Sequence, residues 1–97
     1  MGYRLSGAAD ADLVRAYADG FRQFGGAQAD AYHDRLFRTF DLIAAHPKIA
    51  RERMEYVPPV RIHPVGAHAI VYVETEDGVL IIRVRHGRED WHSDPTE

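Results

Sequence analysis

The sequence contains no cysteine and no long apolar run. The absence of cysteine excludes disulfides and thiolate chemistry and is typical of a reducing compartment. No stretch approaches the roughly 20 apolar residues of a membrane helix, and the N-terminus lacks the charged and apolar regions of a secretory signal. We therefore expect a cytoplasmic protein without membrane contact. A chain of 97 residues can build one modest core, so we expect a single domain over residues 1–97.

The chain also has no excess of positive charge. The net charge is −3 and Lys48 is the sole lysine, whereas general nucleic-acid binders usually present a strongly basic surface. The histidines and acidic residues show no regular metal-ligand spacing, so no metal site is expected. There is no glycine-rich phosphate loop or nucleotide fingerprint, and we therefore expect no cofactor.

Two amphipathic helices are predicted in the first half of the chain. The first begins near Ala8, after Ser6 as N-cap, and ends at a glycine pair, residues 25–26. The second covers about residues 27–45 and ends before Pro47, because the residue before proline avoids helical geometry. Their apolar stripes comprise Leu13, Tyr17 and Phe21 in the first helix and Tyr32, Leu36, Phe40 and Ile43 in the second. The short connection predicts an antiparallel helical hairpin.

A β-hairpin is predicted near the C-terminus, where two β-branched runs flank Glu76-Asp77-Gly78. With Asp77 and Gly78 as the central turn residues, one face is aliphatic and would belong to the core. That face pairs Thr75 with Leu80, Val73 with Ile82 and Val71 with Val84. The other face is mixed: it pairs Ile70 with Arg85, Tyr72 with Arg83 and Glu74 with Ile81. A one-residue slip would exchange the faces of one strand.

The complete pattern predicts an α+β fold of order β-α-α-β-β-β. Short strands are expected at residues 3–5 and 60–63, the latter stopped by Pro64, and residues 48–59 are expected to form a loop. A short N-terminal strand and the antiparallel helical hairpin would then pack on a small, mostly antiparallel sheet. Periodicity is lost after His86, and we expect residues 92–97 to fray.

Short motifs follow one another along the chain in a characteristic order. They are Tyr3-Arg4-Leu5-Ser6, Phe24-Gly25, His46-Pro47, His68-Ala69-Ile70-Val71-Tyr72, Ile82-Arg83-Val84 and His86-Gly87-Arg88. This ordered set spans nearly the whole chain and resembles the ParE toxins of the RelE/ParE superfamily, which belong to type II toxin–antitoxin systems.

The resemblance implies a toxin that inhibits DNA gyrase by binding and that has no enzyme activity of its own. It also implies a ParD-like ribbon–helix–helix antitoxin, which would neutralise the toxin in a hetero-oligomer and make most of the DNA contacts. Apolar helix faces and an open sheet edge are physically suited to accept a helix and a strand from such a partner.

Candidate binding residues follow from the predicted faces. The basic and aromatic side chains expected to contact the target are Arg61, Tyr72, Arg83, Arg85 and Arg88. The aromatic side chains of the helical hairpin expected to contact the antitoxin are Tyr17, Phe21, Tyr32 and Phe37.

The superfamily also includes ribosome-dependent mRNA endonucleases of the RelE type, which gives an enzymatic alternative. RNA cleavage requires proton transfer and cationic stabilisation of the phosphate, and Arg61, Arg83 and His86 would be the catalytic candidates. The scarcity of lysine argues against ribosome binding. In the preferred register His86 lies opposite Ala69 as a hydrogen-bonded structural residue, whereas the slipped register places it among the arginines. A third possibility is an inert interaction module derived from a toxin.

Overall fold

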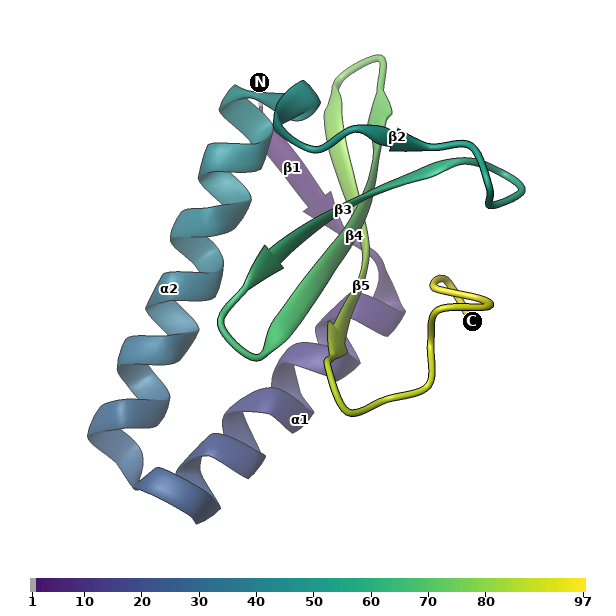
Figure 1. Cartoon of the computed structure of the whole chain (residues 1–97). Coiled ribbons are helices and arrows are strands. Elements are labelled where there is room, and N and C mark those ends of the chain that lie inside the picture. Colours follow the sequence, from purple (N-terminus) through teal and green to yellow (C-terminus); the bar gives the residue numbers. More distant parts are fainter. Residues whose placement is uncertain (1) are drawn as a thin grey trace.

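A five-stranded mixed sheet with two helices on one face forms the protein (Figure 1). The computed structural model describes residues 2–97. The elements are β1 (Gly2–Leu5), α1 (Gly7–Phe24), α2 (Gly26–Ala45), a short 3-10 turn (Pro47–Ile49), β2 (Glu52–Arg53), β3 (Val60–Val65), β4 (His68–Thr75) and β5 (Gly78–His86). The strand order is β1-β5-β4-β3-β2. Among the described strands only β1 and β5 run parallel, so the predicted α+β class and mostly antiparallel sheet are confirmed.

The two helices form the predicted antiparallel hairpin. Ser6 caps α1, because its hydroxyl oxygen accepts a hydrogen bond from the Ala9 amide at 3.0 Å. Gly25 connects the helices with φ of +86°, a conformation that favours glycine. α2 ends at Ala45, two residues before Pro47. The helices diverge from their connection as a V, and the sheet lies against this V (Figure 1).

The main core lies between the helices and the inner face of the sheet. Its buried helical side chains are Ala9, Leu13, Leu36, Phe40 and Ile43. The sheet contributes Val65, Ile70, Tyr72, Val79, Ile81 and Val84. Burial of these apolar surfaces is the principal stabilising contribution to the fold.

The outer face of the sheet is covered by the C-terminal tail, residues 87–97. Trp91 is only 7% exposed and packs with Val60, Ile62 and Val71 in a second apolar cluster. The tail lies on the side of the sheet away from α2 (Figure 1). A hydrogen bond of 2.6 Å from the Tyr56 hydroxyl to the carbonyl oxygen of residue 92 also holds it. The expected fraying of residues 92–97 stays a prediction.

The predicted turn of the β4–β5 hairpin is wrong by one position. Thr75 pairs with Gly78, so Glu76 and Asp77 are the central turn residues. Gly78 has φ of +145° and lies against β1, where an added Cβ would be 2.2 Å from the Gly2 carbonyl oxygen. This glycine is therefore required for the close approach of β1.

The predicted faces of the hairpin are also wrong. A β-bulge shifts the register, because Tyr72 pairs with Ile81 whereas Val71 pairs with Arg83. Ile82 is the extra residue, and Tyr72 and Arg83 consequently do not share a face. The Tyr72 side chain is fully buried in the inner core. The predicted mixed face thus contains core residues, and much of the predicted core face lies outward beneath the tail.

The region before the hairpin differs from the prediction in two respects. β3 continues through Pro64 to Val65. Proline is tolerated there because β2 pairs only with Val60 and Arg61, so Pro64 lies on a free edge of the sheet where no amide donor is required. The short strand β2 lies within the segment predicted to be a loop. Two residues are too few to produce a periodic pattern. Within residues 2–97, no helix is long and apolar enough to cross a membrane.

Candidate partner-binding groove

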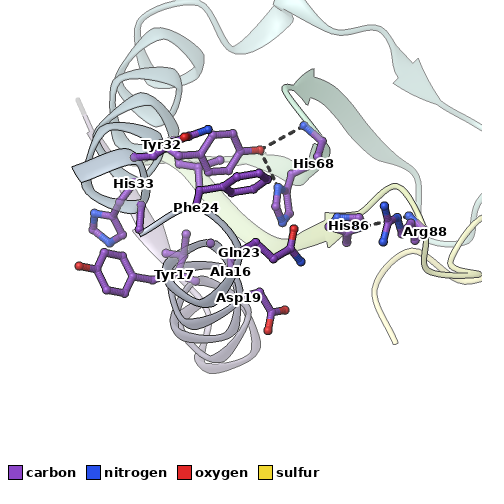
Figure 2. Close-up of a pocket in the computed structure, with 16 residues that line it drawn as sticks. Ala16, Tyr17, Asp19, Gln23, Phe24, Tyr32, His33, His68, His86 and Arg88 are labelled. Carbon is purple, nitrogen blue, oxygen red and sulfur yellow. Dashed lines mark hydrogen bonds between the residues drawn. The ribbon is translucent and has the colours of Figure 1, made fainter. Parts of the chain in front are cut away.

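A cavity of about 390 Å³ lies between the two helices, near their connection. The β3–β4 turn and the end of β5 close its other side (Figure 2). We call it the groove and define it by the side chains of Tyr17, Phe24, Tyr32, His68, His86 and Arg88. It is mainly apolar on the helical side and carries polar groups on the sheet side, as ligand-binding sites commonly do.

Tyr32 connects α2 to the β3–β4 turn within the groove. Its hydroxyl oxygen is 2.6 Å from His68 Nδ1 and accepts a hydrogen bond from the Ala67 amide at 3.2 Å. The Val65 carbonyl oxygen also lies 3.2 Å from this hydroxyl. An added Cβ at Gly66 would be 2.8 Å from the Tyr32 ring, so the turn and the ring are in close contact. Burial raises the pKa of Tyr32.

Two histidines lie side by side at the sheet end of the groove. His68 and His86 pair across β4 and β5, and their ring centroids are 5.0 Å apart in a T-shaped arrangement. Burial, followed by the nearby His86, lowers the pKa of His68. His86 Nδ1 accepts a hydrogen bond from the Arg88 amide at 2.9 Å. The predicted pairing of His86 with Ala69 is wrong.

A second, more polar hollow of about 370 Å³ continues from the groove along α1. It shares His68, His86 and Arg88 with the groove and is bounded further on by Asp12 and Glu89. Arg88 is exposed and forms no ion pair with any of residues 2–97. A partner occupying the groove would therefore meet apolar side chains first and a free cation at the boundary.

Asp12 holds Arg83 at the edge of the sheet. Asp12 is 4% exposed. Its carboxylate accepts hydrogen bonds from Arg83 Nε at 2.7 Å, from Arg83 Nη2 at 2.9 Å and from the Val84 amide at 2.9 Å. The Asp12 hydrogen bond raises the pKa of Arg83. Asp12 was not among the residues predicted from the sequence to have a functional or structural role.

The other predicted arginines are also engaged. Arg61 Nη1 donates to the Ala50 carbonyl oxygen at 2.7 Å, and Nη2 forms an ion pair with Glu74 at 3.1 Å. Arg85 is 6% exposed and lies beneath the tail, with Nη1 3.7 Å from a Glu89 carboxylate oxygen.

The predicted target residues therefore do not form one surface. Tyr72 is in the inner core and donates a hydrogen bond to the Pro47 carbonyl oxygen at 2.7 Å. The three residues of the catalytic alternative likewise have separate partners. Arg61 is bound to Ala50 and Glu74, Arg83 is bound to Asp12, and His86 lies in the groove.

The predicted antitoxin residues are divided between the groove and its surroundings. Tyr17 and Tyr32 line the groove. Phe21 lies beside Tyr17 and is 54% exposed, whereas Phe37 packs against the core. Phe24 was not among the predicted binding residues, but it lines the groove and is 61% exposed. Phe24 was quoted only in the Phe24-Gly25 motif that supports the family resemblance, although an exposed phenylalanine at a helix end is itself a signal for binding.

Comparison with known proteins assigns the family. The model described as "ParE toxin of type II toxin-antitoxin system, parDE" matches residues 3–91. The chain belongs to the ParE toxin family. Toxin ParE1 of Mycobacterium tuberculosis strain H37Rv is 35% identical over 89 residues, which cover 91% of each chain. Toxin ParE3 of Caulobacter vibrioides is 29% identical over 77 residues, 79% of this chain and 77% of that protein. The resemblance to ParE toxins is confirmed, and this family member is a toxin of a type II toxin–antitoxin system.

Proposed function

We propose that this ParE-family toxin acts in the cytoplasm and inhibits DNA gyrase by binding, without enzyme activity. Membership of the ParE family supports the target. The engagement of Arg61 by Ala50 and Glu74, and of Arg83 by Asp12, supports a binding mechanism. A nuclease would require these cations to be free to stabilise a phosphate.

The same proposal includes a ParD-like ribbon–helix–helix antitoxin, whose amphipathic segment occupies the groove in a hetero-oligomer. The observation that carries this assignment is an apolar cavity of about 390 Å³ lined by the exposed Phe24, with Arg88, which has no ion-pair partner among residues 2–97, at its boundary. Apolar side chains of the segment would enter between α1 and α2, and an acidic side chain would meet Arg88. The antitoxin would also supply most of the DNA contacts, in agreement with the net charge of −3.

The predicted contact residues are refined by their positions. For the antitoxin we propose Tyr17, Phe21 and Tyr32, together with Phe24, while Phe37 supports the groove from the core. For the target we propose Arg88 as a direct contact, because it is exposed. The other predicted target residues would affect target binding only indirectly, by supporting the fold. They are Arg61, Tyr72, Arg83 and Arg85.

Co-expression tests this assignment. We expect the toxin alone to arrest growth and the product of the adjacent antitoxin reading frame to restore it. Phe24→Asp should leave the toxin active but weaken antitoxin binding by about a hundredfold, the cost of losing an apolar anchor. Val14→Asp is the matched control, because Val14 is 70% exposed on the same helix and does not line the groove. Equal effects of the two variants would contradict the groove assignment.

A ribosome assay tests the absence of enzyme activity. Ribosomes programmed with mRNA are incubated with the purified toxin, and the message is examined for breaks. We expect intact mRNA, whereas cleavage that depends on Arg61, Arg83 and His86 would establish the nuclease alternative. A folded protein that neither arrests growth nor cuts mRNA would be the inert interaction module.

A further inference from the structure

Three side chains join the groove to the sheet: Tyr32, His68 and His86 (Figure 2). We infer that they form a proton-controlled latch, which holds the antitoxin segment while both imidazoles are neutral and weakens its binding when either is protonated. This inference rests on the proposed function, because the segment that it regulates is the antitoxin segment in the groove.

The first half of the latch is the contact between Tyr32 and His68. When His68 is neutral with Nδ1 unprotonated, this nitrogen accepts the Tyr32 hydroxyl proton over a distance of 2.6 Å. A protonated Nδ1 becomes a donor, and the hydroxyl proton must turn to the Val65 carbonyl oxygen at 3.2 Å. The Tyr32 ring is held against Gly66, so the rearrangement is transmitted to the β3–β4 turn.

The second half of the latch is the contact between His86 and Arg88. His86 Nδ1 accepts the Arg88 amide hydrogen bond at 2.9 Å, and it cannot do so when protonated. Protonation therefore releases the turn that positions Arg88 at the boundary of the groove. The two rings are 5.0 Å apart, and two positive imidazoles at this separation would also repel each other.

Other charges surround the latch, and several favour the protonated state. The carboxylates of Asp12, Asp19 and Glu89 act in this direction on His68. Each already has a cationic partner, namely Arg83, Arg22 and Arg85 respectively. The remaining charges near the latch are Arg35 on α2, which faces Tyr32, Arg15 on α1 and Arg88 after β5. Burial is the largest influence on His68 and opposes its charged form.

Occupation of the groove strengthens this preference. An apolar segment would remove water from His68, which is half-buried in the unbound chain, and would thereby disfavour its charged form further. Linkage is reciprocal: if the bound segment lowers the affinity of His68 for a proton, protonation of His68 lowers the affinity of the toxin for the segment by the same factor. We therefore expect affinity to fall as the pH decreases through the imidazole range.

The isolated toxin provides a test that does not depend on the antitoxin. The measurement combines NMR titration of the His68 and His86 rings with hydrogen exchange of the Ala67 and Arg88 amides, which bond to the latch. As the rings are protonated, we expect the protection factors of both amides to fall about tenfold, while that of the Ile81 amide in the core is unchanged. Constant protection of Ala67 and Arg88 through the titration would overturn the inference.

Antitoxin affinity at about pH 7.5 and about pH 5.5 provides the second test. We expect about tenfold weaker binding at the lower pH, the change that one linked pKa unit produces. His68→Gln should lose most of this dependence. His46→Gln is the control, because His46 is an exposed histidine at the end of α2 that lies outside both the groove and the latch, and it should behave as wild type. Identical pH profiles for the two variants would overturn the latch.

Failure of the groove assignment is distinguishable from failure of the latch. If the antitoxin binds elsewhere, Phe24→Asp will not weaken it at either pH, and the proposed site is wrong. The protection factors of the isolated toxin then decide the latch alone. If Phe24→Asp weakens binding but affinity is independent of pH, the site stands and the latch is wrong.

Discussion

A single carboxylate completes the edge of β5. β1 ends at Leu5, opposite Ile81, so the Val84 amide has no neighbouring strand to accept its hydrogen bond. Asp12 of α1 takes that place and binds the Arg83 guanidinium at the same time. The sequence could not predict this contact, because an aspartate near the start of a helix already has a local explanation in the helix dipole.

Removal of this carboxylate should destabilise the fold markedly. Asp12→Ala leaves the Val84 amide and the Arg83 guanidinium without their acceptor in a buried position. We expect a loss of about 3 kcal/mol in the free energy of unfolding, measured by urea denaturation. Asp10→Ala, an exposed substitution in the first turn of the same helix, should cost less than about 1 kcal/mol. A similar small loss for Asp12→Ala would contradict the account.

His68 should make stability depend on pH in a defined direction. Burial lowers its pKa in the folded state below the ordinary value of 6.5, so below that pH the unfolded chain binds more protons than the folded chain. Its contribution to stability is therefore complete above about pH 6.5 and is lost as the pH falls toward the folded pKa. As the pH is lowered from about 8 to about 5, the urea concentration at the midpoint of unfolding should fall more for wild type than for His68→Gln. Parallel curves would contradict this prediction.

At the scale of elements, the bulge in β5 resolves a conflict between pairing and burial. Ile81 and Val84 are both buried in the inner core, although residues three apart in a regular strand point to opposite faces. The extra residue at Ile82 turns both side chains inward. Burial of the Ile81 and Val84 side chains becomes favourable only in the assembled sheet, so the sequence of β5 alone does not indicate the bulge.

The β1–β5 junction depends on Gly78. An added Cβ would lie 2.2 Å from the Gly2 carbonyl oxygen, and φ of +145° disfavours any other residue. We expect Gly78→Ala to cost about 2 kcal/mol or more, measured by chemical denaturation, with loss of hydrogen-exchange protection in β1. Gly2→Ala is the control, since no heavy atom lies within 4 Å of its added Cβ. Unchanged β1 protection in Gly78→Ala would contradict the role of this close approach.

The helices were predictable from the sequence because their determinants are local. Ser6, the apolar stripes, Gly25 and Pro47 specify the ends and faces of α1 and α2 within a few residues. The existence of the hairpin is equally local. Its register depends on contact with β1, and the role of Arg83 depends on α1. These long-range contacts leave no periodic signal in the sequence.

At the scale of the whole molecule, the two faces of the sheet are protected unequally. Two helices cover the inner face, whereas Trp91 is the main apolar cover of the outer cluster. We expect Trp91→Ala to cost about 3 kcal/mol in unfolding free energy and to promote aggregation, measured by denaturation and light scattering. Ser93→Ala, an exposed change in the same tail, should have little effect. Equal stability of the two variants would mean that the tail does not cover the sheet in solution.

The molecule as a whole is suited to binding. Arg61 and Arg83 each join separate segments of the chain, and the apolar groove has Arg88, which has no ion-pair partner among residues 2–97, at its boundary. A net charge of −3 provides no general attraction to nucleic acid. Under the proposed function, we therefore expect any effect on DNA to depend on gyrase and not on direct binding of the toxin to DNA.

The most direct measurement is a supercoiling and DNA-cleavage assay with purified gyrase and the isolated, folded toxin. We predict loss of supercoiling and accumulation of linear DNA, both prevented when the antitoxin is added first. Plasmid that is supercoiled normally and remains uncut at saturating toxin would contradict gyrase inhibition.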